Sequence, residues 1–154
     1  MALWLALVWG HSLMSGPESS AESSLVVEWA RWILQFLHLD ALPPVARLMG
    51  NYDLFHHVVR KCAHFTEYFI LGLLVVRALL RTVSNRLLAA AILVAFWVGV
   101  PLIDEFIQRF TPQRSGQMSD SLLDMSGFAS ALALCGIVAL VMVQRGRTSR
   151  STTK

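Results

Sequence analysis

Four side chains that can carry a charge or exchange a proton stand at the head of an apolar run, in the stretch KCAHFTEYFILGLLVV. They are Lys61, His64, Glu67 and Tyr68. Positions three and four residues apart lie on one face of a helix, so these side chains form a polar stripe that descends toward the apolar run. At the depth of Glu67, exposure of a carboxylate to lipid costs about 2–3 kcal/mol or more. We therefore expect Glu67 to face neighbouring helices.

Two later segments carry polar residues at helical spacing that can meet this stripe. One segment ends an apolar run and the other begins one. The first contributes Asp104, Glu105 and Gln108, and the second contributes Asp120 and Asp124. Because each set lies at one end of an apolar run, the sequence predicts that three polar stripes meet at the same end of a small helical bundle.

Close helix packing is indicated just after Asp124. Two pairs of small residues follow at four-residue intervals, Gly127 with Ala131 and Ala129 with Ala133. Small residues at this interval allow a neighbouring helix to approach closely.

The polar residues suit the binding of an anionic group. Lys61 and Arg114 would donate charge-assisted hydrogen bonds to a phosphate or carboxylate, and arginine can donate two at once. His64, Tyr68 and Gln108 would add neutral contacts. Four acids would orient the two cations: Glu67, Asp104, Glu105 and Asp120.

Two other roles follow from the same residues. A general acid and base pair would need His64 or Glu67 close to Asp104, which only the fold can bring about. A network of buried ion pairs could instead hold the helices together without doing chemistry.

Metal and hydrolase motifs are weak in this sequence. Three histidines and a glutamate offer metal ligands, but an adjacent histidine pair followed by a gap fits no strong zinc spacing. These residues are His56, His57, His64 and Glu67. Three serines lack the context of a nucleophile elbow or a triad: Ser115, Ser119 and Ser121. We expect no metal and no cofactor, and no recognisable catalytic motif is present.

The composition indicates that the elements positioning these residues are membrane helices. The chain has 154 residues, of which 55% are apolar and 15% are charged. Soluble domains average about 45–50% apolar and about 25% charged residues. Residues 87–103 and 125–143 contain no charged side chain, and as helices they would be about 26 and 28 Å long, close to the hydrocarbon thickness of a bilayer. We predict an all-α, four-helix membrane bundle with spans at about 1–16, 60–80, 86–108 and 121–143.

An additional amphipathic helix is predicted between the first and second spans, over residues 24–39. Its apolar face carries Leu25, Trp29, Trp32, Ile33 and Phe36. Tryptophan is enriched at the level of the lipid headgroups, so this helix is expected to lie in the membrane interface. The preceding GPESSAESS is typical of a flexible link, and the prolines in LPPVARLMGNY would break the helix.

The distribution of basic residues predicts the orientation. The loop between the second and third spans and the tail RGRTSRSTTK together hold seven basic residues and no acid, whereas the other segments are net acidic. Short basic loops tend to stay in the cytoplasm. We expect one membrane domain over 1–144, a basic cytoplasmic tail over 145–154, both termini inside and the polar cluster outside. Cys62 and Cys135 fall in predicted spans and suggest no disulfide.

Three stretches resemble the VanZ-like family of small bacterial membrane proteins: RKCAHFTEYFILG at 60–72, DEFIQRFTPQRSGQMSD at 104–120 and LLDMSG at 122–127. The family pattern falls on Lys61, His64, Phe65, Glu67, Tyr68, Asp104, Glu105, Gln108, Pro112, Arg114, Asp120 and Gly127. Gln113 departs from it, because many relatives have glycine there. The resemblance implies a four-helix integral membrane protein. The founding member is associated with low-level resistance to the glycopeptide teicoplanin, without an established enzymatic reaction.

These observations lead to one leading expectation and two alternatives. We expect a multi-pass protein of the bacterial cell envelope whose polar site, facing outward, binds an anionic lipid-linked envelope component or a glycopeptide antibiotic. The alternatives are a membrane enzyme acting on a lipid-linked substrate and a structural subunit with a buried ion-pair network. Membrane lipids are expected partners, and nucleic acid is not.

Overall fold

The computed structural model of the protein describes residues 2–14, 16–111 and 118–151, and every regular element in these ranges is a helix. The elements are α1 (Ala2–Leu13), α2 (Gly16–Phe36), a short 3-10 helix (Leu39–Ala41), α3 (Pro43–Gly50), α4 (Tyr52–Thr82), α5 (Arg86–Phe110) and α6 (Met118–Ser151). The predicted all-α class is therefore confirmed.

Three of these helices are long and apolar enough to cross a membrane, over Tyr52–Thr82, Arg86–Phe110 and Ser119–Arg145. Even the shortest, with 25 residues, is about 37 Å long, which exceeds a hydrocarbon thickness of about 30 Å. The protein is therefore an α-helical membrane protein. By contrast α1 has 12 residues and is about 18 Å long, so the fourth span at about 1–16 stays a prediction.

Asparagine caps fix where two of the long helices begin. The Asn51 side chain accepts a hydrogen bond from the backbone N–H of Leu54 at 3.1 Å, and α4 therefore begins several residues before the predicted span at 60. Asn85 accepts from the N–H groups of Leu87 and Leu88 and starts α5 after a three-residue connection. Both caps satisfy backbone donors that have no partner within the helix.

The segment before α4 differs in part from the prediction. The residues expected to form a flexible link are the first turns of α2, which begins at Gly16. Pro17 explains this, because proline in the first turn removes only an N–H that the helix leaves unpaired and presets its φ angle. As predicted, the chain breaks before the prolines, but Pro43 and Pro44 then open α3 rather than a loop.

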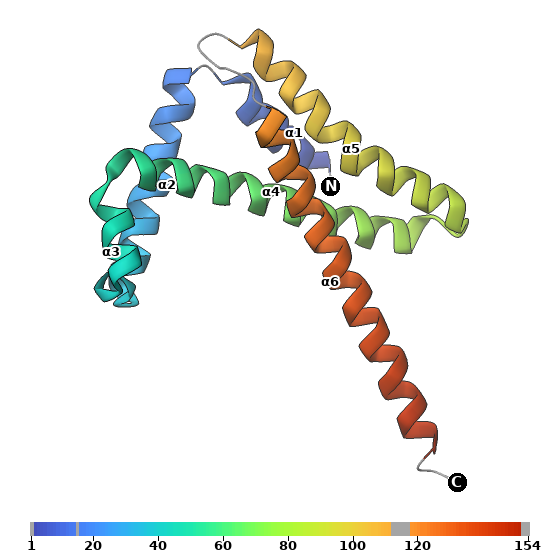
Figure 1. Ribbon diagram of the computed structural model, residues 1–154. Helices are drawn as coiled ribbons and strands as arrows, with labels where there is room; N and C mark the ends of the chain where they lie inside the picture. Colours follow the sequence, from blue (N-terminus) through green and yellow to red (C-terminus); the bar gives the residue numbers. More distant parts are fainter. Residues whose placement is uncertain (1, 15, 112–117, 152–154) are drawn as a thin grey trace.

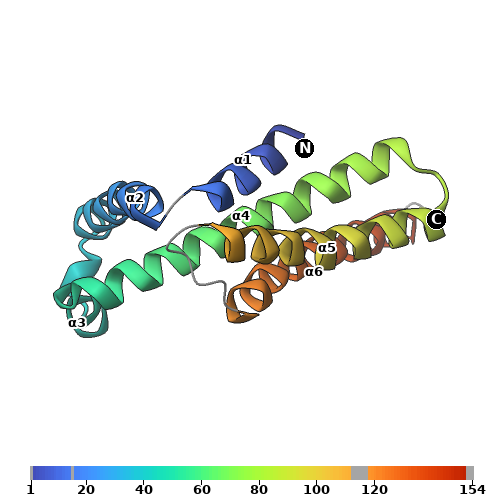
Figure 2. The same ribbon diagram turned by 90° about the horizontal axis from the view of Figure 1, so that it is seen from above.

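The long helices cross one another, and α1 rests against two of them. In Figure 1 α6 crosses α4 near its middle, while α5 runs back from the end of α4. The described helices in contact include α4 with α6, α5 with α6, and α1 with both α4 and α5. Seen from above in Figure 2, α1 lies beside the long helices rather than at the end of the molecule. The polar residues at the start of α6 are thus brought to the middle of α4.

Two glycines allow α4 and α6 to approach closely. A Cβ atom at Gly72 would lie 2.8 Å from the Ala131 Cβ, and one at Gly127 would lie 3.2 Å from the backbone carbonyl carbon of Phe65. The predicted contact face of Gly127 and Ala131 is therefore confirmed. The pair Ala129 and Ala133 does not share it, because Ala133 is exposed.

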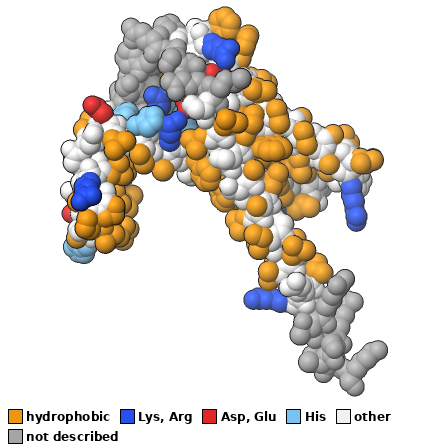
Figure 3. Space-filling view, viewed as in Figure 1, with side chains coloured by type: hydrophobic (Ala, Val, Ile, Leu, Met, Phe, Trp, Pro, Cys, Tyr) orange, Lys and Arg blue, Asp and Glu red, His pale blue; other side chains and the backbone are white. Residues whose placement is uncertain are grey.

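A small apolar core lies beside this crossing. Its buried members are Val8 of α1, Tyr68, Leu71, Val75 and Leu79 of α4, Val100 of α5 and Phe128 of α6. Elsewhere the spans present apolar side chains outward, and Figure 3 shows hydrophobic side chains over much of the visible surface of α5 and of the described part of α6. Such a surface suits contact with lipid.

Candidate functional site

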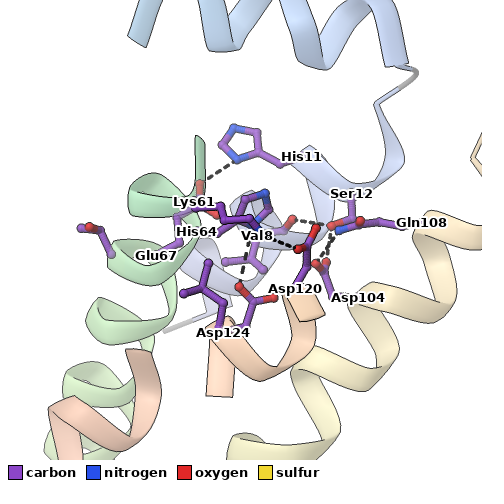
Figure 4. Close-up of polar contacts among 12 residues, drawn as sticks. Val8, His11, Ser12, Lys61, His64, Glu67, Asp104, Gln108, Asp120 and Asp124 are labelled. Atoms are coloured by element: carbon purple, nitrogen blue, oxygen red, sulfur yellow. Dashed lines mark hydrogen bonds and ion pairs between the residues drawn. The ribbon is translucent and has the colours of Figure 1, made fainter. Parts of the chain in front are cut away.

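Polar side chains of α4 and α6 face each other in successive pairs where the two helices cross (Figure 4). We call this set the polar ladder: Lys61, His64 and Tyr68 of α4 with Asp120 and Asp124 of α6. The spacing within each helix is one turn, as the sequence predicted, so the pairs are stacked along the crossing. From Lys61 to Tyr68 the ladder extends about 10 Å along α4.

The outermost pair joins Lys61 to Asp120. The Lys61 Nζ donates to Asp120 Oδ1 at 2.8 Å, and about a third of each side chain is exposed. Ser119 Oγ donates to the same carboxylate oxygen at 3.3 Å. Among the described residues, Asp120 is the hydrogen-bond partner of the Lys61 ammonium, which carries three donors in all.

The next pair, His64 with Asp124, lies one turn deeper. The His64 Nδ1 and Asp124 Oδ1 atoms are 3.9 Å apart, a separation that allows electrostatic attraction but exceeds a hydrogen bond. Asp124 is only 3% exposed. Ser121, three residues earlier in α6, is buried to the same degree. Neither Ser121 Oγ nor Asp124 Oδ1 has a hydrogen-bond partner among the described residues.

Tyr68 forms the floor of the ladder. Its side chain is fully buried, and its hydroxyl oxygen has no hydrogen-bond partner among the described residues. Tyr68 also belongs to the apolar core, so its ring packs among hydrophobic side chains. The ladder therefore ends where the apolar core begins.

Asp104 joins α1 to α5 through a buried hydrogen-bonded group. Ser12 Oγ donates to Asp104 Oδ1, and Gln108 Nε2 donates to Asp104 Oδ2 at 2.9 Å. Thr111 Oγ1 donates to the backbone carbonyl of Ser12 at 3.0 Å. We call Ser12, Asp104, Gln108 and Thr111 the α1–α5 latch. Both carboxylate oxygens of Asp104 are thus satisfied from within the protein.

Glu67 turns to α1. Its Oε1 atom lies 3.0 Å from His11 Nδ1, and the indole N–H of Trp4 donates to its backbone carbonyl at 2.9 Å. Its side chain is 19% exposed. As expected, Glu67 faces a neighbouring helix, although that helix is α1 and the partner is a histidine.

Glu105 is the remaining predicted site residue that the structure describes. Glu105 is buried on α5, with its Oε1 atom 3.6 Å from Arg109 Nε, one turn later in the same helix. Arg114 lies outside the described residues, as do Pro112 and Gln113.

Sequence reasoning missed His11, Ser12 and Thr111. A signal for the first two was present, because His11 and Ser12 are the only side chains with strong hydrogen-bonding groups in MALWLALVWGHSL apart from the two indoles. Trp4, Val8 and Ser12 also repeat at four-residue steps on one face. Their partners could not be read from the sequence.

The polar ladder presents both hydrogen-bond acceptors and a cationic donor. No group of three histidine, cysteine, aspartate or glutamate side chains in the described part of the chain is placed to hold a metal ion. Asp124 Oδ1 in the ladder and Ser121 Oγ on the same helix can receive hydrogen bonds from hydroxyl, amide or ammonium groups, and Lys61 at the open end can donate to an anion.

The family comparison covers nearly all of these elements. The family model described as VanZ/LLP1 matches residues 1–140, which include α1 with the latch as well as the polar ladder. No curated protein and no solved structure matches the chain. With three helices able to cross a membrane and a match that extends over most of its length, the chain is a membrane protein that belongs to the VanZ/LLP1 family.

Proposed function

We propose that this protein binds an anionic, lipid-linked component of the bacterial cell envelope at the polar ladder. The observation that carries the proposal is the combination of Lys61 at the open end with two buried acceptors, Ser121 Oγ and Asp124 Oδ1, that lack hydrogen-bond partners among the described residues. Buried polar atoms in folded proteins are nearly always paired, so unpaired ones suggest a bound group.

Two parts of such a ligand would contact different positions along α4 and α6. A phosphate or carboxylate would contact Lys61, because the carboxylate of Asp124 lies one turn deeper and repels anions. Hydroxyl or amide groups of the same ligand would donate to Asp124 and Ser121. A saccharide linked to lipid through phosphate offers both kinds of group.

The binding assay uses the full-length protein in lipid nanodiscs and a polyprenyl diphosphate-linked saccharide as probe. Lys61→Gln should weaken its binding about tenfold or more, since it removes a charge-assisted hydrogen bond. Arg77→Gln is the matched control, because Arg77 is an exposed cation on the same helix, away from the ladder. Equal affinity of the wild type and Lys61→Gln would contradict the proposal, as would equal binding of the polyprenol without phosphate.

Teicoplanin is the second probe in this assay, because the founding member of the family is associated with resistance to it. Competition between teicoplanin and the lipid-linked saccharide would place both at the ladder. Analysis of the lipid after incubation separates binding from catalysis: chemical conversion by the wild type, lost in His64→Gln, would establish the enzyme alternative.

A structural role is a second candidate for part of the network. Asp104 is fully hydrogen-bonded within the protein and 1% exposed, which favours a role in holding α1 against α5. We propose that the latch serves folding while the ladder serves binding. An Asp104→Asn protein that folds normally but loses binding would overturn this division.

A further inference from the structure

Aromatic side chains form an exposed row on α2, far from the ladder in the chain. The Trp29 and Trp32 ring centroids are 6.0 Å apart with their planes at 81°, and Trp32 stacks on Phe36 at 5.4 Å. The two indoles are 65% and 55% exposed. The two indoles meet edge to face, and the exposed part of each can contact a group that favours π surfaces.

A surface pocket of about 540 Å³ is lined by these two indoles and by Glu28. Glu28 has no ion pair or hydrogen bond within the described ranges. The nearest cation in the helix, Arg31, interacts with other residues. Arg31 donates to the Met49 carbonyl at 3.4 Å and lies over the Phe55 ring, 5.6 Å from its centroid. The pocket therefore combines two indole rings with a carboxylate that has no ion pair among the described residues.

This combination is selective for a cation. The face of an indole ring carries negative potential and attracts ammonium groups, and a carboxylate adds a full negative charge. A phosphate group alone would be repelled by Glu28. The pocket is thus complementary to an ammonium group.

The surroundings of the pocket indicate a lipid rather than a free amine. Leu25, Ile33 and Phe36 on the same helix are 60%, 46% and 68% exposed, so apolar surface extends beside the pocket. Tryptophans at the headgroup level with apolar residues below are the usual pattern of a helix in the membrane interface.

We propose that Glu28, Trp29 and Trp32 form a binding site for the ammonium group of a zwitterionic membrane lipid, with the acyl chains against the adjoining apolar face of α2. The site is separate from the polar ladder and does not depend on the function proposed there. It gives the protein a preference among membrane lipids rather than a general attraction to the bilayer.

The test measures which lipids remain bound. The full-length protein is reconstituted in nanodiscs of equal phosphatidylethanolamine and phosphatidylglycerol, extracted mildly, and analysed by native mass spectrometry. The wild type should retain phosphatidylethanolamine in excess over phosphatidylglycerol. Glu28→Gln and Trp29→Leu should each lower this excess roughly three- to tenfold. An equal ratio of the two lipids on the wild type, or an unchanged ratio on Glu28→Gln, would overturn the proposal.

Two controls separate the site from general effects. Phe106→Leu removes an exposed aromatic ring of α5, and Asp53→Asn removes an exposed carboxylate of α4; both should leave the lipid ratio unchanged. If either control lowers the ratio as much as Glu28→Gln does, the pocket is not the site. Trp29→Phe covers the case in which Trp29→Leu fails to fold, and should give an intermediate ratio. Millimolar phosphoethanolamine should not displace the lipid; displacement would show that the ammonium group alone is recognised.

Discussion

His11 of α1 lies 3.0 Å from Glu67 in the middle of α4, measured from Nδ1 to Oε1. The two residues are separated by 56 positions in the chain. This contact and the hydrogen bond from the Trp4 indole to the Glu67 carbonyl hold α1 against α4, at the predicted polar stripe. A carboxylate that would be costly in lipid is thereby satisfied from within the protein.

The coupling between His11 and Glu67 can be measured with a double-mutant cycle. Glu67→Gln and His11→Ala should each lower the free energy of unfolding, and the double variant should be less destabilised than the sum, with a coupling of about 1 kcal/mol. Urea unfolding in detergent micelles, followed by circular dichroism, provides the measurement. Strict additivity would show that the contact contributes nothing.

Ser12→Ala tests the α1–α5 latch. The substitution leaves one oxygen of the buried Asp104 carboxylate without its donor, which costs about 1–3 kcal/mol of unfolding free energy. Proteolysis of α1 in membranes should accelerate accordingly. Ser126→Ala is the control, because the Ser126 hydroxyl is exposed and donates to the Leu123 carbonyl of its own helix. Equal protease sensitivity in both variants would rule out the latch.

Alanine at Gly127 should destabilise the crossing of α4 and α6. The added methyl group would meet the Phe65 backbone, which cannot move as a side chain can, so we expect a loss of about 1–3 kcal/mol. Gly136→Ala is the control: open space surrounds that position, and alanine favours the helix by up to about 1 kcal/mol. Thermal unfolding in micelles compares the two, and a Gly127→Ala protein as stable as Gly136→Ala would refute the tight crossing.

Lys61→Gln should leave the fold almost unchanged, which is what makes it useful as a binding variant. The Lys61–Asp120 pair is about one third exposed, and such pairs contribute about 1 kcal/mol or less. Membrane abundance and unfolding midpoint should therefore match the wild type. A marked loss of either would show that the pair has a structural role and that reduced binding has another cause.

The sequence determined the three long helices and the spacing of their polar residues. Apolar runs of sufficient length predict membrane helices, because only a helix satisfies every backbone group of a single span in lipid. The intervals between Lys61, His64 and Tyr68, and between Asp120 and Asp124, predict stripes on α4 and α6. Helical periodicity is a local property, so it can be read without knowing the fold.

Only the tertiary structure decided which stripes meet. Ser12 and Asp104 are 92 positions apart, and nothing local to either residue indicates the other. The crossing placed Gly127 against α4 while leaving Ala133 exposed, although both belong to equally spaced pairs of small residues. The reason is physical: spacing fixes the face on which a side chain lies, whereas its partner depends on how helices distant in the chain pack together.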